Sequence, residues 1–287
     1  MEWLLAILIA IFGPGLLPGS APAAPGGDGV TIPLDPLGAD EGGPLPRVTP
    51  ARGTNPPLVV IDPGHGGRDP GAASPHIASP EKDVTLALGL AMRDALARTG
   101  RVRVAMTRED DRYLLLEDRY QIARRLDADL FISIHADAAP LNDAAHGATV
   151  YTLSEVASDR EAALLAGREN AAGRIAGARL SADPNVNVIL IDLAQREAMN
   201  VSADFARLLY REGAPLFPFR PDWHRFAAFV VLKAPDIPSI LFESGYLTNA
   251  TDAAYISSAQ GRQQIAEGMR RAIEAHFARR LELGGRS

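Results

Sequence analysis

The sequence predicts an α/β fold, a single domain in which a mostly parallel, twisted sheet is flanked by helices on both faces. Short apolar runs rich in β-branched residues, typical of buried strands, alternate along the chain with longer segments of helical periodicity. Parallel strands need long crossover connections, which the helical segments supply. The expected strands are Leu58–Asp62, Arg103–Met106, Leu130–Ile134, Gly147–Leu153, Phe226–Lys233 and Ser239–Phe242, and the expected helices are Glu81–Thr99, Leu115–Leu126 and Ala259–Leu283.

The first expected helix has the clearest end signals. Ser79 and Pro80 come immediately before two acidic residues of its first turn, an arrangement typical of a helix start. Its apolar residues fall mostly on one broad face, and Gly100 follows as a stop signal. The uninterrupted apolar character of Leu130–Ile134 indicates a buried strand.

The head of the chain has the features of an export signal. The apolar run Trp3–Phe12 is shorter than the roughly 20 residues that a membrane span needs, and Ala21-Pro22-Ala23 is a small-x-small cleavage pattern. Residues 1–23 are therefore interpreted as a signal peptide, which implies a periplasmic location. Because Met1-Glu2 carries no basic residue, a displaced start or an uncleaved anchor is the alternative.

A linker and one domain are expected after the signal. Residues 24–56 are rich in Gly, Pro, Asp and Ala and have few large apolar side chains, so we expect a disordered linker there. The remaining segment, residues 57–283, is long enough to bury a substantial core. No transmembrane span is expected after the head.

Composition excludes several classes of function. The formal net charge is −6 and the pI about 5.6, so the chain has no basic excess with which to bind nucleic acid. The chain has no cysteine, which excludes disulfides, thiolate metal sites and a cysteine nucleophile.

A histidine lies where the first strand breaks into a glycine-rich turn. His65 follows the strand and Pro63, with glycines on both sides that remove bulk and permit positive φ. In α/β sheets, ligands bind beyond the carboxyl ends of the strands. A lone histidine in such a turn is usually only a loop residue, so a chemical role depends on partners.

Three residues elsewhere are candidate partners. Glu81 begins the first helix, and His135 directly follows the strand Leu130–Ile134. Two histidines and a carboxylate form a His₂Glu set, which suits a catalytic Zn²⁺ with one coordination position left for water. Glu243 ends a further strand and is the candidate general base.

These motifs resemble a known enzyme family. The segments Ile61–Gly67, Glu81-Lys82, Ser133–Ala136 and Phe242–Tyr246 closely resemble those of the zinc-dependent N-acetylmuramoyl-L-alanine amidases of the bacterial cell-wall amidase type 3 family. The resemblance covers about Pro57–Phe277 and includes the order of the motifs. It implies hydrolysis of the amide between N-acetylmuramic acid and L-alanine in peptidoglycan, with His65, Glu81 and His135 as zinc ligands.

The segment Ser154–Gln195 is expected to be an insert of regulatory function. Its first part, Arg160–Asn170, has a polar, alanine-rich helical pattern. The segment is similar to one in division-associated amidases, where a helix covers the zinc until an activator protein displaces it. Glu169 and Asp183 are the candidate blocking ligands. The alternative is that the insert only extends the fold and packs on its edge.

Charged residues near the motifs have less specific interpretations. Asp62 is a candidate hydrogen-bond acceptor that would orient a ligating imidazole through its other ring nitrogen, and it is equally a candidate cap for the turn backbone. Thr107-Arg108 and Arg119 also recur in the family pattern. We favour structural roles for the two arginines over substrate contact, since isolated charged residues are usually paired or solvated.

The remaining histidines are not expected to bind metal. His276 lies among alanines and arginines and is expected at the surface, and His76 lies in a loop without a fixed partner. His224 follows Trp223 in a proline-containing connection and is a candidate for lining the cleft; His146 has no assigned role.

Two other functions remain open on the sequence alone. A zinc carboxypeptidase acting on wall peptides would use a similar metal set, and a catalytically inactive wall-binding module would keep the fold. The presence of all four site residues favours an active enzyme.

Overall fold

The fold contains one seven-stranded sheet within the part of the chain that the structure describes. This structure, a computed structural model, describes residues 43–139, 142, 144–174 and 188–284. The strand order is β1-β3-β2-β4-β7-β5-β6. The bounds are β1 Val48–Thr49, β2 Leu58–Pro63, β3 Arg103–Met106, β4 Leu130–Asp137, β5 Ala148–Leu153, β6 Phe219–Ala227 and β7 Ser239–Tyr246.

The sheet is mostly parallel, as the sequence predicts. The pairs β2–β3, β2–β4, β4–β7 and β5–β6 are parallel, whereas β1–β3 and β5–β7 are antiparallel. The central strands β2, β4 and β7 are neighbours that run in the same direction, so their carboxyl ends meet at one edge of the sheet. This edge is where the candidate site residues lie.

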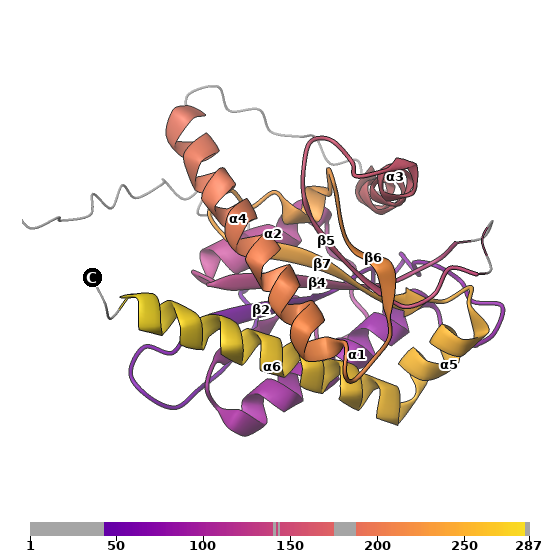
Figure 1. Cartoon of the computed structure of the whole chain (residues 1–287), viewed down its shortest axis with the longest axis horizontal. Helices are drawn as coiled ribbons and strands as arrows, with labels where there is room; N and C mark the ends of the chain where they lie inside the picture. Colours follow the sequence, from indigo (N-terminus) through magenta and orange to yellow (C-terminus); the bar gives the residue numbers. More distant parts are fainter. Residues whose placement is uncertain (1–42, 140–141, 143, 175–187, 285–287) are drawn as a thin grey trace, which may run out of the picture. The chain divides into compact units, whose positions relative to one another are not determined.

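Helices cover both faces of the sheet (Figure 1). The α-helices are α1 Glu81–Thr99, α2 Leu116–Arg125, α3 Arg160–Arg174, α4 Val188–Gly213, α5 Ala250–Ser257 and α6 Ala259–Gly284, and η1 Val230–Leu232 is a 3₁₀ turn. Helices α1, α4, α5 and α6 pack on one face, whereas α2, α3 and η1 pack on the other. Each face therefore has its own hydrophobic core.

Alternation along β2 shows how both cores form from one strand. Val59 and Ile61 enter the core beneath α1, α4 and α6, whereas Leu58 and Val60 enter the core on the opposite face. Successive side chains of a strand point to opposite faces, so a strand covered on both sides is continuously apolar. This two-sided burial explains why the strongest strand signals came from the central strands.

The chain between residues 213 and 239 differs from the prediction. The strand expected over Phe226–Lys233 is wrong: β6 covers Phe219–Ala227, and Val230–Leu232 forms the 3₁₀ turn η1. Strand β6 pairs only with β5 at the edge of the sheet and leaves several side chains partly exposed, so its sequence lacks an apolar run. Val231 and Leu232 of η1 are buried in the core on the α2 and α3 face of the sheet instead.

Other differences concern segments for which no element was predicted. Helices α4 and α5 were missed; Asn249 caps α5 by accepting hydrogen bonds from the backbone amides of Thr251 and Asp252. Strand β1 lies within the segment expected to be a disordered linker, and it pairs antiparallel with β3. The predicted signal peptide, residues 24–42 of the linker and Asp183 lie outside the described residues.

None of the helices in the described part of the chain combines the length and the apolar character needed to cross a bilayer.

Candidate metal centre

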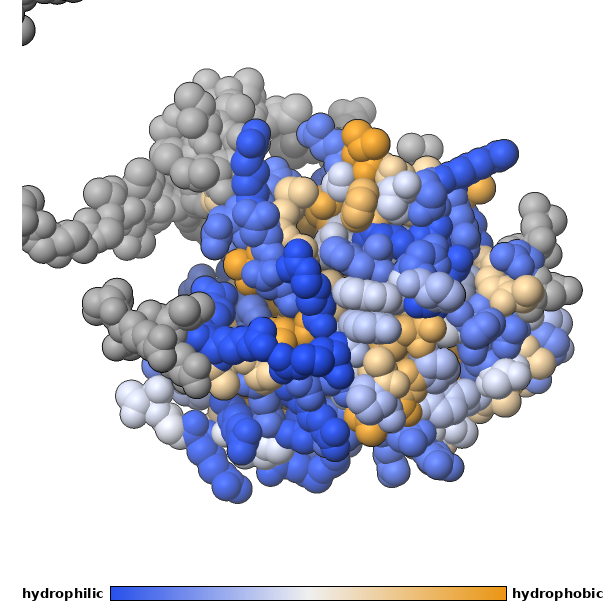
Figure 2. Space-filling model, in the orientation of Figure 1, coloured by the Kyte–Doolittle hydropathy of each residue, from blue (hydrophilic) through white to orange (hydrophobic). Residues whose placement is uncertain are grey.

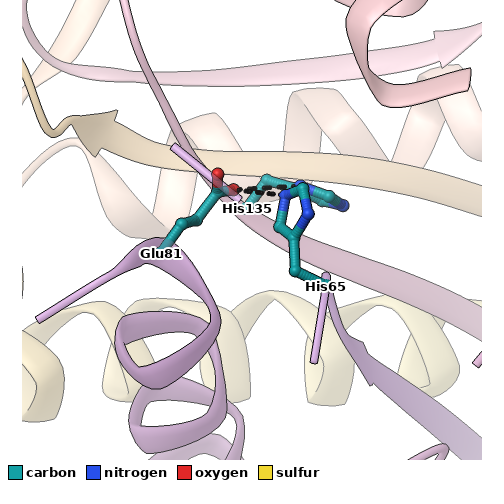
Figure 3. Close-up of side chains that lie close together, drawn as sticks. All are labelled: His65, Glu81 and His135. Atoms are coloured by element: carbon teal, nitrogen blue, oxygen red, sulfur yellow. Dashed lines mark hydrogen bonds and ion pairs between the residues drawn. The ribbon is translucent and has the colours of Figure 1, made fainter. Parts of the chain in front are cut away.

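Three of the predicted site residues converge at the carboxyl edge of the sheet (Figure 3). His65 follows β2, His135 lies near the end of β4, and Glu81 is the first residue of α1. One potential ligand atom from each of the three lies within 4.8 Å of those of the other two. All three side chains are buried. Long stretches of chain separate the three in sequence, and the parallel topology brings them together.

One oxygen of the Glu81 carboxylate lies close to both imidazoles (Figure 3). Its Oε1 is 3.1 Å from His65 Nε2 and 3.1 Å from His135 Nδ1. Two backbone amides hold this carboxylate, because Oε1 accepts from Ala136 at 3.0 Å and Oε2 accepts from Ala72 at 2.8 Å. Glu81 is thus fixed in place by the main chain and presented to both rings.

Glycines make the close approach of these side chains possible. A Cβ atom on Gly64 would lie 2.4 Å from His135 Cε1, and one on Gly71 would lie 2.7 Å from both Glu81 Oε2 and His65 Cδ2. Both positions therefore exclude a side chain. His65 itself has a φ of 60°, a left-handed conformation that a non-glycine residue rarely adopts and that is typical of functional sites.

Asp69 orients His65, a role that the sequence analysis did not assign. Its Oδ2 lies 2.9 Å from His65 Nδ1, and its Oδ1 accepts from the Gly71 amide at 3.2 Å. Burial raises the pKa of Asp69, but the hydrogen bond and charge of His65 outweigh it and hold the pKa below its usual value. An ionised Asp69 only accepts, so Nδ1 carries a proton and Nε2 is the ring nitrogen left to bind a metal ion.

The donor set fits a divalent metal ion. His65 Nε2 is buried and has no hydrogen-bond partner of acceptable geometry among the described residues, although two carboxylates lie beside it. Burial lowers the pKa of His65, but the charges of Glu81 and then Glu169 raise it well above its usual value. Histidine nitrogens and a carboxylate oxygen are ligands that Zn²⁺ binds in proteins.

Glu243 lies next to His135 across the β4–β7 pair. The side chain is 1% exposed, and neither carboxylate oxygen has a hydrogen-bond partner among the described residues. Burial, followed by the charges of Asp137 and Glu81, raises the pKa of Glu243 well above its usual value. A buried carboxyl group with a raised pKa and free lone pairs is well suited to accept a proton during catalysis.

Asp62 does not contact either imidazole in the described structure. It accepts hydrogen bonds from Thr107 Oγ1 at 2.5 Å, Ser133 Oγ at 2.8 Å and Arg119 Nη1 at 2.9 Å. Burial raises the pKa of Asp62, but the Arg119 charge and these hydrogen bonds lower it overall. Asp62 thus acts on the turn through Arg119, whose Nη2 donates to the carbonyl of His65 at 2.8 Å.

The two arginines have the structural roles that were favoured. Arg108 is fully buried and donates to the carbonyls of Pro63 at 2.9 Å and Gly64 at 2.8 Å. Arg119 donates to the same Pro63 carbonyl at 2.9 Å. Together they satisfy the carbonyls of the turn that presents His65.

Helix α3 brings Glu169 to the metal centre. Its Oε2 lies 3.4 Å from His65 Nε2 and 3.3 Å from His135 Nδ1. The cavity between these residues measures only about 10 Å³, room for about one water molecule. Helix α3 thus closes the site.

Hydrogen bonds on both sides of Glu169 hold α3 in this position. Arg168 Nη2 donates to Asp137 Oδ1 at 2.7 Å. Asn170 donates through Nδ2 to the Ala228 carbonyl at 2.8 Å and accepts from the Val230 amide at 2.9 Å. The three consecutive side chains Arg168, Glu169 and Asn170 all contact the sheet or η1.

The four remaining histidines lie outside the metal centre. The expectation that His276 is at the surface is wrong, because it is 5% exposed and packs edge-on against Phe205 and Phe277. His146 and His76 are exposed, and His76 Nε2 bonds the Thr248 carbonyl at 3.1 Å. His224 is hydrogen-bonded to Thr152 at 3.1 Å and stacks on Trp223.

Comparisons with known proteins identify the family. Residues 59–275 match the family model described as N-acetylmuramoyl-L-alanine amidase. The chain is 34% identical to N-acetylmuramoyl-L-alanine amidase AmiC of Escherichia coli over 78% of this chain and 53% of that protein. It is 36% identical to AmiA of Escherichia coli over 77% of this chain and 76% of that protein. The chain thus spans about half the length of AmiC.

Among solved structures, the catalytic domain of CwlV, an N-acetylmuramoyl-L-alanine amidase from Bacillus (Paenibacillus) polymyxa var. colistinus, superposes with a TM-score of 0.58. The sequence identity is 25%, and the match covers 77% of this chain and 98% of that domain. Together with the matched family model, this similarity extends over the sheet edge that holds His65, Glu81, His135 and Glu243. The chain belongs to the N-acetylmuramoyl-L-alanine amidase family.

Proposed function

We propose that this protein is a zinc-dependent peptidoglycan hydrolase that cleaves the amide bond between N-acetylmuramic acid and the L-alanine of the stem peptide. The observation that carries the proposal is the convergence of His65, Glu81 and His135, with Glu243 beside His135 on the neighbouring strand. The family supplies the bond, since the matched relatives are named for this amidase activity.

The site residues have distinct roles in the proposed reaction. His65, Glu81 and His135 would hold Zn²⁺, with Asp69 fixing the ring of His65. A zinc ion held there would supply Lewis-acid polarisation of the amide carbonyl and would acidify a water molecule. Glu243 takes a proton from the attacking water and passes it to the nitrogen of the leaving L-alanine.

The environment of Glu243 supports this proton transfer. A base that begins ionised must hold the proton long enough to deliver it to the leaving amine, and a raised pKa makes that transfer more favourable. Burial and the neighbouring acids produce the raised pKa. The absence of hydrogen-bond partners for its oxygens, within the described residues, leaves both oxygens available for water or the amine.

We also propose that the enzyme is exported to the periplasm and is self-inhibited. Glu169 lies within 3.4 Å of a nitrogen of each histidine, so its carboxylate would fill the coordination position that substrate and water need. An activator protein that binds the insert and withdraws α3 would open the site, a form of control suited to an enzyme of cell division. Asp183, the other candidate blocking ligand, lies outside the described residues.

Two ion pairs hold the chain at the start of α3. Glu161 pairs with Arg220 at 2.8 Å, and Asp159 pairs with Arg225. The two acids are 40% and 39% exposed, whereas Arg220 and Arg225 are only 13% and 3% exposed. An activator that withdraws α3 would therefore have to offer acids of its own to these two guanidinium groups.

Product analysis on isolated sacculi tests the proposed reaction. The purified protein, with Glu169→Ala to open the site, should release peptides that carry a new N-terminal alanine, and a zinc chelator should stop the release. Release of terminal D-alanine instead would identify a carboxypeptidase. Binding to sacculi without any released product would indicate a wall-binding module.

A further inference from the structure

Within the described residues, a buried carboxylate next to the candidate metal centre is paired with a cation of α3. Asp137 is the last residue of β4, and its side chain is 2% exposed. Its Oδ1 lies 2.7 Å from Arg168 Nη2, and Arg168 Nη1 donates to the neighbouring Ala138 carbonyl at 2.7 Å. Among the described residues, Arg168 is the cation that makes a salt bridge with Asp137.

The same helix thus occupies two adjacent positions with opposite charges. Glu169 places a carboxylate between His65 and His135, and the preceding residue, Arg168, places a guanidinium on Asp137. His135 and Asp137 are two residues apart on one strand, a distance of roughly 7 Å. The position of the Arg168 guanidinium is therefore about two residues along β4 from the metal ligand His135.

Withdrawal of α3 would remove the partner of Asp137. Arg168 is the group that offsets the charge of Asp137 in the closed form, and Glu243 adds a further carboxylate at the same edge of the sheet. Two acceptors, Asp137 Oδ1 and the Ala138 carbonyl, already point at one cationic group. The opened site is therefore prepared to bind a cation from the substrate.

We propose that Asp137 and the Ala138 carbonyl form a subsite for an ammonium group on the stem peptide, and that Arg168 occupies this subsite in the closed enzyme. The inference rests on the proposed function, because that function places a peptide at this edge of the sheet. The γ-linkage of the D-glutamate makes the stem peptide longer than an ordinary extended peptide, which advances about 3.3 Å per residue, so an ammonium group two residues beyond the L-alanine can span the roughly 7 Å to the subsite. In the closed enzyme, Arg168 then occupies the position of the substrate's ammonium group, and Glu169 occupies the position of its scissile bond.

A binding measurement tests the subsite without relying on catalysis. The protein with Arg168→Ala and Glu169→Ala, loaded with zinc, is titrated calorimetrically with the tripeptide L-Ala–γ-D-Glu–L-Lys and with its Nε-acetyl derivative. Acetylation removes the charge and retains the length of the side chain. We expect the free amine to bind at least about tenfold more tightly, a preference typical of a charge-assisted hydrogen bond.

Two further variants locate the preference. Adding Asp137→Asn should abolish the preference, because it should weaken binding of the tripeptide with the free amine and leave binding of the acetylated tripeptide unchanged. Adding Asp94→Asn should preserve the preference. Asp94 is an exposed acid on α1, 13 residues or about 20 Å along the helix from Glu81. With Arg168 and Glu169 restored, the two peptides should bind equally weakly.

The outcomes separate the subsite from the amidase assignment. Equal affinity for the two peptides in the opened protein, or an equal loss for both on Asp137→Asn, would overturn the subsite. The comparison of the two peptides in the opened protein needs no substitution at Asp137, so it remains a valid test even if the Asp137→Asn variant does not fold. A tenfold preference together with no cleavage of sacculi would support the subsite and remove the amidase reaction.

Discussion

The Oδ2 atom of Asp69 lies 2.9 Å from Nδ1 of His65, and this pair fixes which nitrogen of the imidazole faces the metal centre. The bond forms because the chain doubles back: Gly66 and Asp69 exchange backbone hydrogen bonds of 2.9 and 3.1 Å. Asp69 would therefore act on a bound metal ion through His65 and not by direct contact.

Replacing Asp69 should weaken metal binding without abolishing it. Loss of a carboxylate that orients a ligating histidine typically costs 10- to 100-fold in metal affinity. We expect Asp69→Ala to lower the zinc affinity by that factor, measured by competition with a chromophoric chelator, and Asp69→Asn to have a smaller effect. As a control, Asp110→Ala in the exposed loop nearby should leave the affinity unchanged; an unchanged affinity in Asp69→Ala would remove the orienting role.

Replacing Glu169 should activate the enzyme. The carboxylate lies within 3.4 Å of both histidines, so its removal opens the position that it occupies. We expect Glu169→Ala to raise the rate of hydrolysis of purified sacculi by about tenfold or more, as relief of about 1.4 kcal/mol of inhibition would do.

The matched control is Glu155→Ala, which removes an exposed acid from the same insert. Its rate should equal that of the unmodified protein. Equal rates for Glu169→Ala and the unmodified protein would mean that α3 packs on the site without inhibiting it.

Replacing Glu243 should remove catalysis and keep the metal. In the opened background with Glu169→Ala, Glu243→Gln should lower kcat by about 10²- to 10⁴-fold, the usual loss for a general base. Zinc content should stay unchanged, because Glu243 is not among the three clustered ligands. Because the pKa of Glu243 is raised, the enzyme that retains Glu243 should lose activity with decreasing pH, and the loss should occur at a higher pH than an ordinary glutamate would give. A Gln variant with near-normal kcat would exclude Glu243 as the general base.

Burial of His276 should make stability depend on pH. Burial and then the charge of Arg280 lower the pKa of His276 to about 4, whereas an unfolded histidine has a pKa of about 6.5. Between these pH values the His276 imidazole binds a proton in the unfolded chain but not in the folded one. The contribution of the buried neutral ring to stability is therefore fully present above pH 6.5 and is lost as the pH falls towards 4.

Urea unfolding of the purified protein across this range measures the effect. The free energy of unfolding should fall between pH 6.5 and pH 4 in the unmodified protein. We expect this fall to be smaller in His276→Leu by on the order of 2 kcal/mol. The exposed His146→Gln is the control and should keep the slope of the unmodified protein. If His276→Leu has that slope as well, His276 does not titrate in this range.

Most of the site residues that the sequence predicts follow buried strands, and Glu81 is marked instead by the start of a helix. His135 and Glu243 directly continue apolar runs, and His65 follows one across a glycine turn, so strand order alone places them together. Asp69 is also visible in the sequence, four residues after His65. Its role depends on the backbone bonds of the turn, which no periodicity encodes.

The parts that the sequence does not predict lack a one-sided pattern. Strand β6 is a partly exposed edge strand and therefore lacks an apolar run. The apolar run that follows it forms the 3₁₀ turn η1, and the sequence analysis assigned this run to a strand. His276 lies among alanines and arginines, but the face of α6 that carries it packs on Phe205 of α4. Asp62 was expected to orient an imidazole or to cap the turn, yet its contact with Arg119 depends on a helix from elsewhere in the chain.

The most direct test of the central claim is the metal content of single-ligand variants. Elemental analysis should find one zinc per chain in the unmodified protein and almost none in His65→Ala or His135→Ala, with far-UV circular dichroism showing that the variants remain folded. His76→Ala, which removes an exposed histidine from a loop near the site, should retain a full complement. A full complement of zinc in either His65→Ala or His135→Ala would contradict the proposed metal centre.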